Sequence, residues 1–198
     1  MSHLSDYQVT MNINIDHIIT QCLIPERNGQ RQLYNYTFRH LVTAVALYTG
    51  DTSERDWVFN LGMLKVYNSL TNYKRGTNYL GWARTILVRS AIDHIRKNKT
   101  YQDHLAPVVV EDDHTIATTA NDALSKMETD DLIKVIQSLP ENERMIFTMY
   151  EIEGYTHVDI EKITSIKKNT SKWLLAKARK ALQEKTAHFT NLKENGHG

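Results

Sequence analysis

The residues whose types most clearly indicate a binding function form a basic run near the carboxyl end of the chain. Residues 161–185 contain eight Lys or Arg and two Glu, a net charge of +6. Such cations neutralise phosphates, and an exposed helix that carries them fits the major groove of DNA. The alternative is a plain helical hairpin with a solvated basic face. The interpretation as an exposed cationic helix predicts that residues 161–185 form a nucleic-acid interface.

The basic run is expected to form the last helix of a helix-turn-helix within 138–182. A Leu-Pro pair begins one further helix before it, because proline is tolerated in a first turn, and Gly154 ends that helix in the left-handed conformation. Thr156 then caps the second helix, and Asp159 completes a capping box. The third helix is expected to begin at about residue 169. Its candidate caps are Asn169 and Thr170.

Three more helices are predicted over 30–50, 54–70 and about 77–97, from apolar residues at helical intervals. The caps of the last two are one residue of 51–53 and one of Thr77 and Asn78. The helix over 54–70 is expected to bury Trp57, Val58, Leu61, Leu64 and Leu70. Residues 84–99 carry a net charge of +4, which predicts a second basic surface.

An acidic segment separates the two basic ones. Residues 103–131 contain eight Asp or Glu and one Lys, a net charge of −7. The overall charge of +1 therefore conceals two basic patches. We expect an all-α fold of two small helical domains joined by a flexible acidic linker, with a short helix over 128–138. The expected parts are an extension 1–28 without assigned role, a first domain 29–99, the linker 100–126, a helix-turn-helix domain 127–186 and a tail 187–198.

Composition and motifs narrow the classes of function. Hydrophobic residues make up 41% of the 198, the mean hydropathy is −0.47, and no apolar run approaches the roughly 20 residues of a membrane span. We therefore expect no membrane insertion and a cytoplasmic location. Cys22 is the lone cysteine, and the nine histidines lack metal-ligand spacing. Because no phosphate loop or nucleophile elbow is present either, we expect no metal, cofactor or catalytic residue.

Residues 33–183 resemble the extracytoplasmic-function (ECF) group of bacterial RNA polymerase sigma factors. The stretch LPENERMIFTMYEIEGYTHVDIEKI, then SI and NTSKWLLAKARKAL, follows that family's order of an apolar helix ending in Glu-Gly-Tyr, a Ser/Thr-started helix and a Thr-x-Lys recognition helix. KVYNSLTNYKRG and GWARTILVRSAIDHIRKNK are similar to its core-binding and promoter-melting helices. The resemblance implies core RNA polymerase and promoter DNA as partners, and an anti-sigma factor as a further candidate.

The resemblance implies that the second domain reads the duplex minus-thirty-five element. The matching positions lie on the recognition helix, at its start, and where the preceding helix meets the DNA backbone. They are occupied by Thr156, His157, Lys168, Asn169, Thr170, Lys172, Trp173, Lys177 and Arg179. Ser165 stands where the family usually has a turn glycine. Lysine stands where the family has arginine, and lysine cannot form the bidentate pair of hydrogen bonds that arginine makes to guanine. The promoter preference is therefore expected to differ.

The resemblance also implies that the first domain captures unpaired bases of the minus-ten element. Tyr73 matches the aromatic residue of the base-capturing loop, where stacking is worth about 1–3 kcal/mol per base. A surface cation–π pair with the adjacent cations is the alternative interpretation of this residue. The expected minus-ten contacts are Tyr73, Lys74, Arg75, Arg84, Arg89, Arg96 and Lys97. The expected contacts to core polymerase are Asp56, Asn60 and Lys65.

The core-binding helix departs from the family pattern. In the family pattern this helix has an Asp and, three residues later, a Gln followed by an acidic residue. At those positions this chain has Trp57, Asn60 and Leu61. This departure leaves open a second function, a degenerate sigma-like module that holds an anti-sigma factor. A stand-alone helix-turn-helix regulator is a third, although it gives the basic helix 84–97 and the Tyr73 loop no role.

Overall fold

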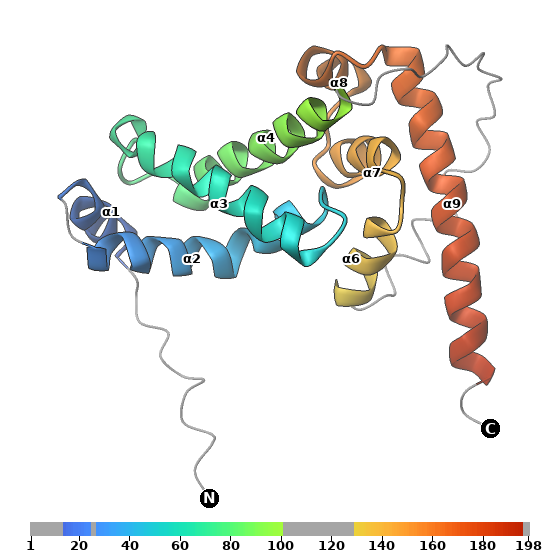
Figure 1. The fold of residues 1–198 in the computed structure, drawn as a ribbon, viewed down its shortest axis with the longest axis horizontal. Helices are drawn as coiled ribbons and strands as arrows, with labels where there is room; N and C mark the ends of the chain where they lie inside the picture. The colour runs from blue at the N-terminus through green and yellow to red at the C-terminus, as the bar shows by residue number, and fades with distance from the viewer. Residues whose placement is uncertain (1–13, 25–26, 101–128, 196–198) are drawn as a thin grey trace, which may run out of the picture.

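The computed structural model describes residues 14–24, 27–100 and 129–195, and every regular element within these ranges is helical. The first half holds α1 (Ile15–Leu23), α2 (Arg27–Ala46), α3 (Thr52–Asn68), the 3-10 turn η1 (Leu70–Asn72) and α4 (Tyr79–Thr100). The second half holds α6 (Thr129–Gln137), α7 (Glu141–Phe147), the π-helical turn η2 (Thr148–Ile152), α8 (His157–Thr164) and α9 (Lys168–Asn195) (Figure 1). The predicted all-α fold in two regions is confirmed. The predicted linker lies almost entirely outside the described residues.

Helices α2, α3 and α4 pack together and form the core of the first half (Figure 1). Their fully buried side chains include Leu33, Phe59, Met63, Leu87 and Ile92. Helices α3 and α4 approach closely at Gly62 of α3, where a Cβ atom would lie 2.6 Å from a methyl carbon of Leu87. Helix α1 packs on α2 and adds Ile18 and Ile19 to the core. Helix α1 lies within the extension 1–28, to which the sequence assigned no role.

The predicted caps position α3 and α4. The Asp51 side chain accepts a hydrogen bond from Glu54 N at 2.8 Å, and Asn78 Oδ1 accepts one from Gly81 N at 3.0 Å. Each cap pairs an amide of the first turn that has no partner within the helix. Asp51 and Asn78 are thus the candidate caps that the structure uses, and α3 begins at Thr52, two residues before the predicted start at 54.

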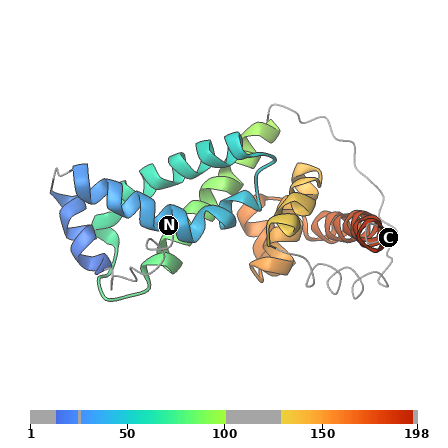
Figure 2. The ribbon, with the colours of Figure 1, turned by 90° about the horizontal axis from the view of Figure 1, so that it is seen from below.

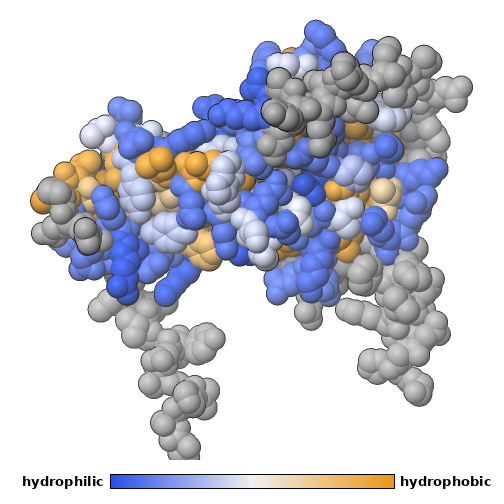
Figure 3. Space-filling view, viewed as in Figure 1, coloured by the Kyte–Doolittle hydropathy of each residue, from blue (hydrophilic) through white to orange (hydrophobic). Residues whose placement is uncertain are grey.

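The predicted burial of three α3 side chains is wrong. Trp57, Leu61 and Leu64 are 53%, 39% and 57% exposed, and they follow one another at helical spacing along the outer face of α3. The opposite face, which includes Phe59 and Met63, packs into the core. Because α3 has apolar residues on both faces, its periodicity could not separate core from surface. Hydrophobic surface is visible over the first half in Figure 3.

The helix predicted from the Leu-Pro pair to Gly154 is regular only in its first part. After Phe147 the chain widens into the π-helical turn η2, in which Glu153 N donates to Thr148 O at 3.0 Å. Gly154 follows with a φ of 75°, as the sequence predicted. π-helical turns inside helices often occur at functional sites. Side chains of 148–153 make contacts outside their own helix, such as the hydrogen bond from Thr148 Oγ1 to Leu47 O at 3.1 Å.

Helices α8 and α9 form the predicted helix-turn-helix. Both bonds of the capping box between Thr156 and Asp159 are present at the start of α8. Helix α9 begins at Lys168, earlier than the predicted Asn169 or Thr170 cap, because Glu161 Oε2 accepts a hydrogen bond from Lys168 N at 3.2 Å. Helix α9 also continues to Asn195, where the sequence predicted a tail from 187.

The two halves are in contact. Helix α2 contacts α6, and side chains of the second half bond to backbone oxygens at the carboxyl end of α2. Figure 2 shows the second half against the end of the first, with α9 on the outside. The sequence left this packing open.

Candidate nucleic-acid interface

A left-handed turn directs α9 away from α8. Ser165 has a φ of 64° and a ψ of 7°, a conformation that residues other than Gly, Asn and Asp seldom adopt. Thr164 Oγ1 accepts a hydrogen bond from Ile166 N at 3.1 Å, which closes the turn from inside. Ile160, Leu175 and Ala178 are buried and pack the two helices on the rest of the second half.

The first two turns of α9 present exposed polar and cationic side chains. These residues are Lys168, Asn169, Thr170 and Lys172. Ser171, between Thr170 and Lys172, and Leu174, after Lys172, are buried and face the rest of the second half. This combination of cations and hydrogen-bonding groups can meet both phosphates and base edges.

Further along α9, the predicted contact residues are bound to the second half itself. Lys177 Nζ lies 2.7 Å from Oε1 of Glu143, whose residue is 3% exposed, and 5.2 Å from the centre of the Trp173 ring. Arg179 Nε donates to Glu151 Oε1 at 2.8 Å, and its guanidinium lies over the Tyr150 ring. Trp173 and Arg179 are half-buried. These contacts hold α9 on α7 and η2.

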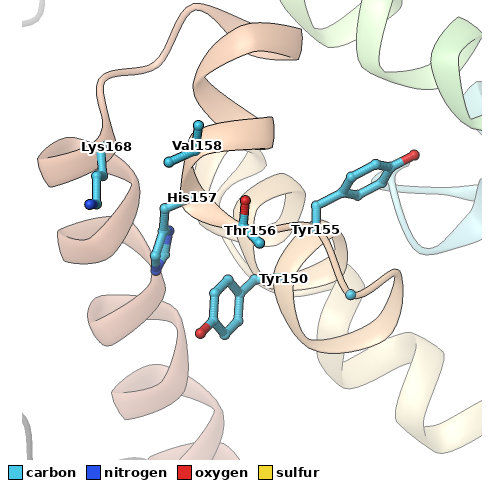
Figure 4. Close-up of a pocket in the computed structure, with 7 residues that line it drawn as sticks. Tyr150, Tyr155, Thr156, His157, Val158 and Lys168 are labelled. Carbon is cyan, nitrogen blue, oxygen red and sulfur yellow. The ribbon is translucent and has the colours of Figure 1, made fainter.

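An open pocket of about 460 Å³ lies where α8 begins. Lys168 and His157 lie at one side of it in Figure 4, and Tyr155 points away from them. The His157 ring stacks on Tyr150 with centres 4.5 Å apart, and its Nδ1 lies 2.9 Å from Ser171 Oγ. Burial lowers the pKa of the His157 imidazole, and nearby cations, first Lys172, lower it further.

Tyr73, predicted to stack on a base, lies in the core of the first half. Its residue is 6% exposed, and its ring centre is 5.2 Å from that of Trp82. Its hydroxyl donates to Thr77 O at 2.6 Å, which closes the loop 73–77. The neighbouring Lys74 and Arg75 are exposed. The loop therefore presents two cations around a buried aromatic ring.

The cations of α4 differ in their contacts. Arg89, Arg96 and Lys97 are exposed, and Arg96 lies 3.9 Å from Asp93. Arg84 is half-buried and forms an ion pair of 2.5 Å with Glu153, from the second half. Arg84 is thus the predicted minus-ten residue that links the two halves.

The predicted polymerase contacts lie beside the exposed stripe of α3, which consists of Trp57, Leu61 and Leu64. Asp56 pairs with its neighbour Arg55 at 2.8 Å, and Asn60 Oδ1 accepts a hydrogen bond from the Tyr34 hydroxyl at 2.8 Å. Lys65 Nζ lies 3.3 Å from Asp93 Oδ2. Each of these polar side chains has a partner in the first half.

Family models match both halves of the chain. Residues 30–101 match sigma-70 region 2, and residues 129–182 match sigma-70 region 4. The chain belongs to the sigma-70 family. Region 2 followed by region 4 is the pair typical of ECF sigma factors, so the resemblance found in the sequence is confirmed. The comparison with curated proteins gives no match.

This sigma factor binds core RNA polymerase and promoter DNA and acts in promoter recognition, and sigma factor families are not enzymes. Within the described ranges, no cluster of three or more His, Cys, Asp or Glu could hold a metal ion. No helix of the same ranges is long and apolar enough to span a membrane.

The sequence did not indicate the acidic partners that hold the predicted DNA-binding residues. These partners are Glu143, Glu151 and Glu153. A second missed feature is Asp16 of α1, whose Oδ2 accepts a hydrogen bond from Gly76 N at 3.1 Å in the loop after Tyr73. The helical spacing could have indicated that Glu143 lies near the core, because it is one α-helical turn from the buried Phe147. The Asp16 contact joins residues 60 positions apart and has no local signal.

Proposed function

We propose that this sigma factor reads the minus-thirty-five duplex with the first two turns of α9. The observation that carries the proposal is the exposed set Lys168, Asn169, Thr170 and Lys172, directly after the left-handed turn at Ser165. Asn169 and Thr170 are suited to base edges, and lysines to phosphates. Lys177, Trp173 and Arg179 then support the helix from the side that faces α7 and η2.

The pocket at the start of α8 is suited to a phosphate group of the same duplex. Lys168 supplies a charge, and the amino-terminal end of a helix favours anions. His157 and Thr156 line the same pocket. Binding a phosphate there would fix the register of α9 in the groove, which is the usual effect of backbone contacts.

For the minus-ten element, we assign the backbone contacts of the melted strand to Lys74, Arg75, Arg89 and Lys97, because these cations are exposed. Base stacking by Tyr73 requires its ring to leave Trp82 and Thr77. Tyr73→Ala should therefore impair melting, whereas Tyr73→Phe, which keeps the ring and removes the bond to Thr77, should not. Permanganate reactivity of the minus-ten thymines measures this, and normal reactivity with Tyr73→Ala would exclude base capture by this residue.

The exposed stripe of α3 is our candidate for the polymerase contact, with Asn60 and Lys65 at its margins. Large exposed apolar side chains that are close together commonly mark protein interfaces. The same stripe supports the alternative function, a module that binds an anti-sigma factor instead of polymerase. Leu61→Asp should lower affinity for core polymerase under the first assignment. Because core polymerase acts in the cytoplasm, we place the protein there.

The minus-thirty-five assignment is tested by salt dependence. Holoenzyme made with Lys172→Ala should bind promoter duplex with a salt slope reduced by about one, since one phosphate contact is lost. Lys134→Ala, an exposed lysine of α6 outside the proposed interface, is the matched control. An unchanged slope for Lys172→Ala would show that this part of α9 does not contact phosphates. A footprint by the protein without polymerase would instead favour a stand-alone regulator.

A further inference from the structure

The loop between η1 and α4, residues 73–77, is closed by hydrogen bonds between its two ends. The Tyr73 hydroxyl donates to Thr77 O at 2.6 Å, and Thr77 Oγ1 donates to Lys74 O at 2.6 Å. Between these ends the chain turns at Gly76, which is exposed and has a φ of 73°. The Gly76 amide donates out of the loop, to Asp16 Oδ2 of α1 at 3.1 Å. A bond from α1 therefore holds the tip of the loop.

Helix α1 is a fixed support for this bond. Asn14 caps its start, because the Asn14 side chain accepts a hydrogen bond from His17 N at 3.1 Å. Ile18 and Ile19 are buried, and α1 packs on α2 and contacts η1. Figure 1 and Figure 2 both show α1 at the end of the first half that lies away from the second half. Asp16, in the first turn of α1, is therefore held beside the loop by packing within the first half.

The Asp16 carboxylate is only half satisfied in this position. Its Oδ1 is buried and has no hydrogen-bond partner among the described residues. A buried polar atom without a partner costs stability, so each such group in a native protein requires an explanation. A charged acceptor also forms a stronger bond to a backbone amide than a neutral acceptor does. The residue type at position 16 thus favours a strong bond to Gly76 over the greatest stability of α1.

The bond acts on the two exposed cations that precede Gly76. These are Lys74 and Arg75, which are assigned above to the backbone of the melted minus-ten strand. Glycine populates many backbone conformations, so a loop that turns at Gly76 without an anchor would present the cations in a range of positions. Ordering a loop and its long side chains on binding opposes association. An anchor at Gly76 removes part of that cost before DNA binds.

The contacts of the loop differ in whether base capture requires them to break. Stacking of Tyr73 on a base requires its ring to leave Trp82 and its hydroxyl to leave the carbonyl that it binds. The bond between Asp16 and Gly76 uses no atom of Tyr73, so it does not have to break. The loop thus has one contact that opens on capture and one that keeps its cations in place.

We propose that α1 is part of the minus-ten reader and that Asp16 is a positioning residue for the loop 73–77. Asp16 binds the Gly76 amide and thereby presents Lys74 and Arg75 to the melted strand. Helix α1 precedes residues 30–101, the range that matches sigma-70 region 2, so that match does not include it. The proposal rests on the proposed function in its assignment of Lys74 and Arg75, and it gives a role to part of the extension 1–28.

The test measures the affinity of holoenzyme for the single-stranded minus-ten segment of a promoter that it transcribes. Asp16→Ala removes the acceptor for Gly76 N. Asp16→Asn removes the same charge but keeps an oxygen acceptor of the same reach, so it is the rescue. Thr20→Ala removes the bond from Thr20 Oγ1 to Asp16 O at 2.8 Å, within α1, and controls for a general weakening of this helix.

Asp16→Ala should lower the affinity about three- to tenfold, while Asp16→Asn and Thr20→Ala stay within about twofold of the parent. In a background of Lys74→Ala with Arg75→Ala, Asp16→Ala should have less than about a twofold effect, because residues that act through one another are not additive. A merely structural role of Asp16 would give the same loss in both backgrounds.

Unchanged affinity with Asp16→Ala would overturn the proposal, as would an equal loss in both backgrounds or with Asp16→Asn. The pair Lys74→Ala and Arg75→Ala separates this failure from that of the proposed function. If the pair leaves the affinity unchanged, the assignment of these cations falls and the positioning role with it. A loss with the pair but not with Asp16→Ala refutes the positioning role alone. If Asp16→Ala loses helical circular-dichroism signal, Asp16→Leu, of similar shape and a better helix former, replaces it under the same criteria.

Discussion

At the scale of residues, similar lysines of α9 have different roles. Lys172 and Lys177 both matched DNA-facing positions in the sequence, but Lys177 pairs with the buried Glu143. Removing one member of such a pair leaves a buried carboxylate without compensation. We therefore assign the packing of α9 on α7 to Lys177 and the DNA affinity of α9 to Lys172.

Lys177→Ala should lower the free energy of unfolding by about 1–3 kcal/mol, the usual cost of an unsatisfied buried polar group. Lys172→Ala should change it by less than about 0.5 kcal/mol, as exposed substitutions usually do. Urea denaturation of the two variants measures the difference. Equal stability would mean that Glu143 does not depend on Lys177.

His157 should make the protein less stable in acid. Its pKa is lowered in the folded state, chiefly by burial, so the folded protein binds a proton less readily than the unfolded chain. Stability is then full above the ordinary histidine pKa of about 6.5 and is lost as the pH falls through the lower folded pKa. His157→Gln should lose less stability than the parent between pH 7.5 and pH 5.5. The same loss in both proteins would contradict this role.

At the scale of elements, local sequence signals predicted where most helices begin. Thr156 was identified as a cap, and Asp51 and Asn78 were among the candidate caps, because each satisfies an amide of its own first turn. The start of α9 was missed because its cap is Glu161, on the preceding helix. The π-helical turn η2 was missed because a side-chain bond made from it, from Thr148 Oγ1 to Leu47 O, joins it to a distant part of the sequence.

The turn between α8 and α9 has a conformation that glycine would adopt more easily. Ser165→Gly should raise the free energy of unfolding by about 0.5–1 kcal/mol, because it relieves the left-handed backbone at a small entropic cost. Gly154→Ala is the matched opposite change, since Gly154 has a φ of 75° and, apart from its chain neighbours, no atom lies within 4 Å of its missing Cβ. That variant should lose about 1–2 kcal/mol. Urea denaturation that finds Ser165→Gly less stable would contradict the argument.

At the scale of the whole molecule, the sequence predicted the two helical regions but not their contact. The motifs of the two halves are local or follow helical spacing, so they could be recognised one by one. The contact between the carboxyl end of α2 and the second half joins residues separated by about a hundred positions, such as Leu47 and Thr148, and has no local signal. The same limit explains why the outer stripe of α3 was expected in the core, since only the packing of α3 on α2 and α4 decides which of its two apolar faces is covered.

In the function proposed above, this sigma factor directs core polymerase through α9 and the first half. Run-off transcription on genomic fragments, with core polymerase from the source organism and this protein added or omitted, tests it most directly. We expect discrete new transcripts whose start sites share minus-ten and minus-thirty-five elements, and their loss with Lys168→Ala and Lys172→Ala combined. Core binding without any new transcript would contradict the account and favour a module that binds a regulator.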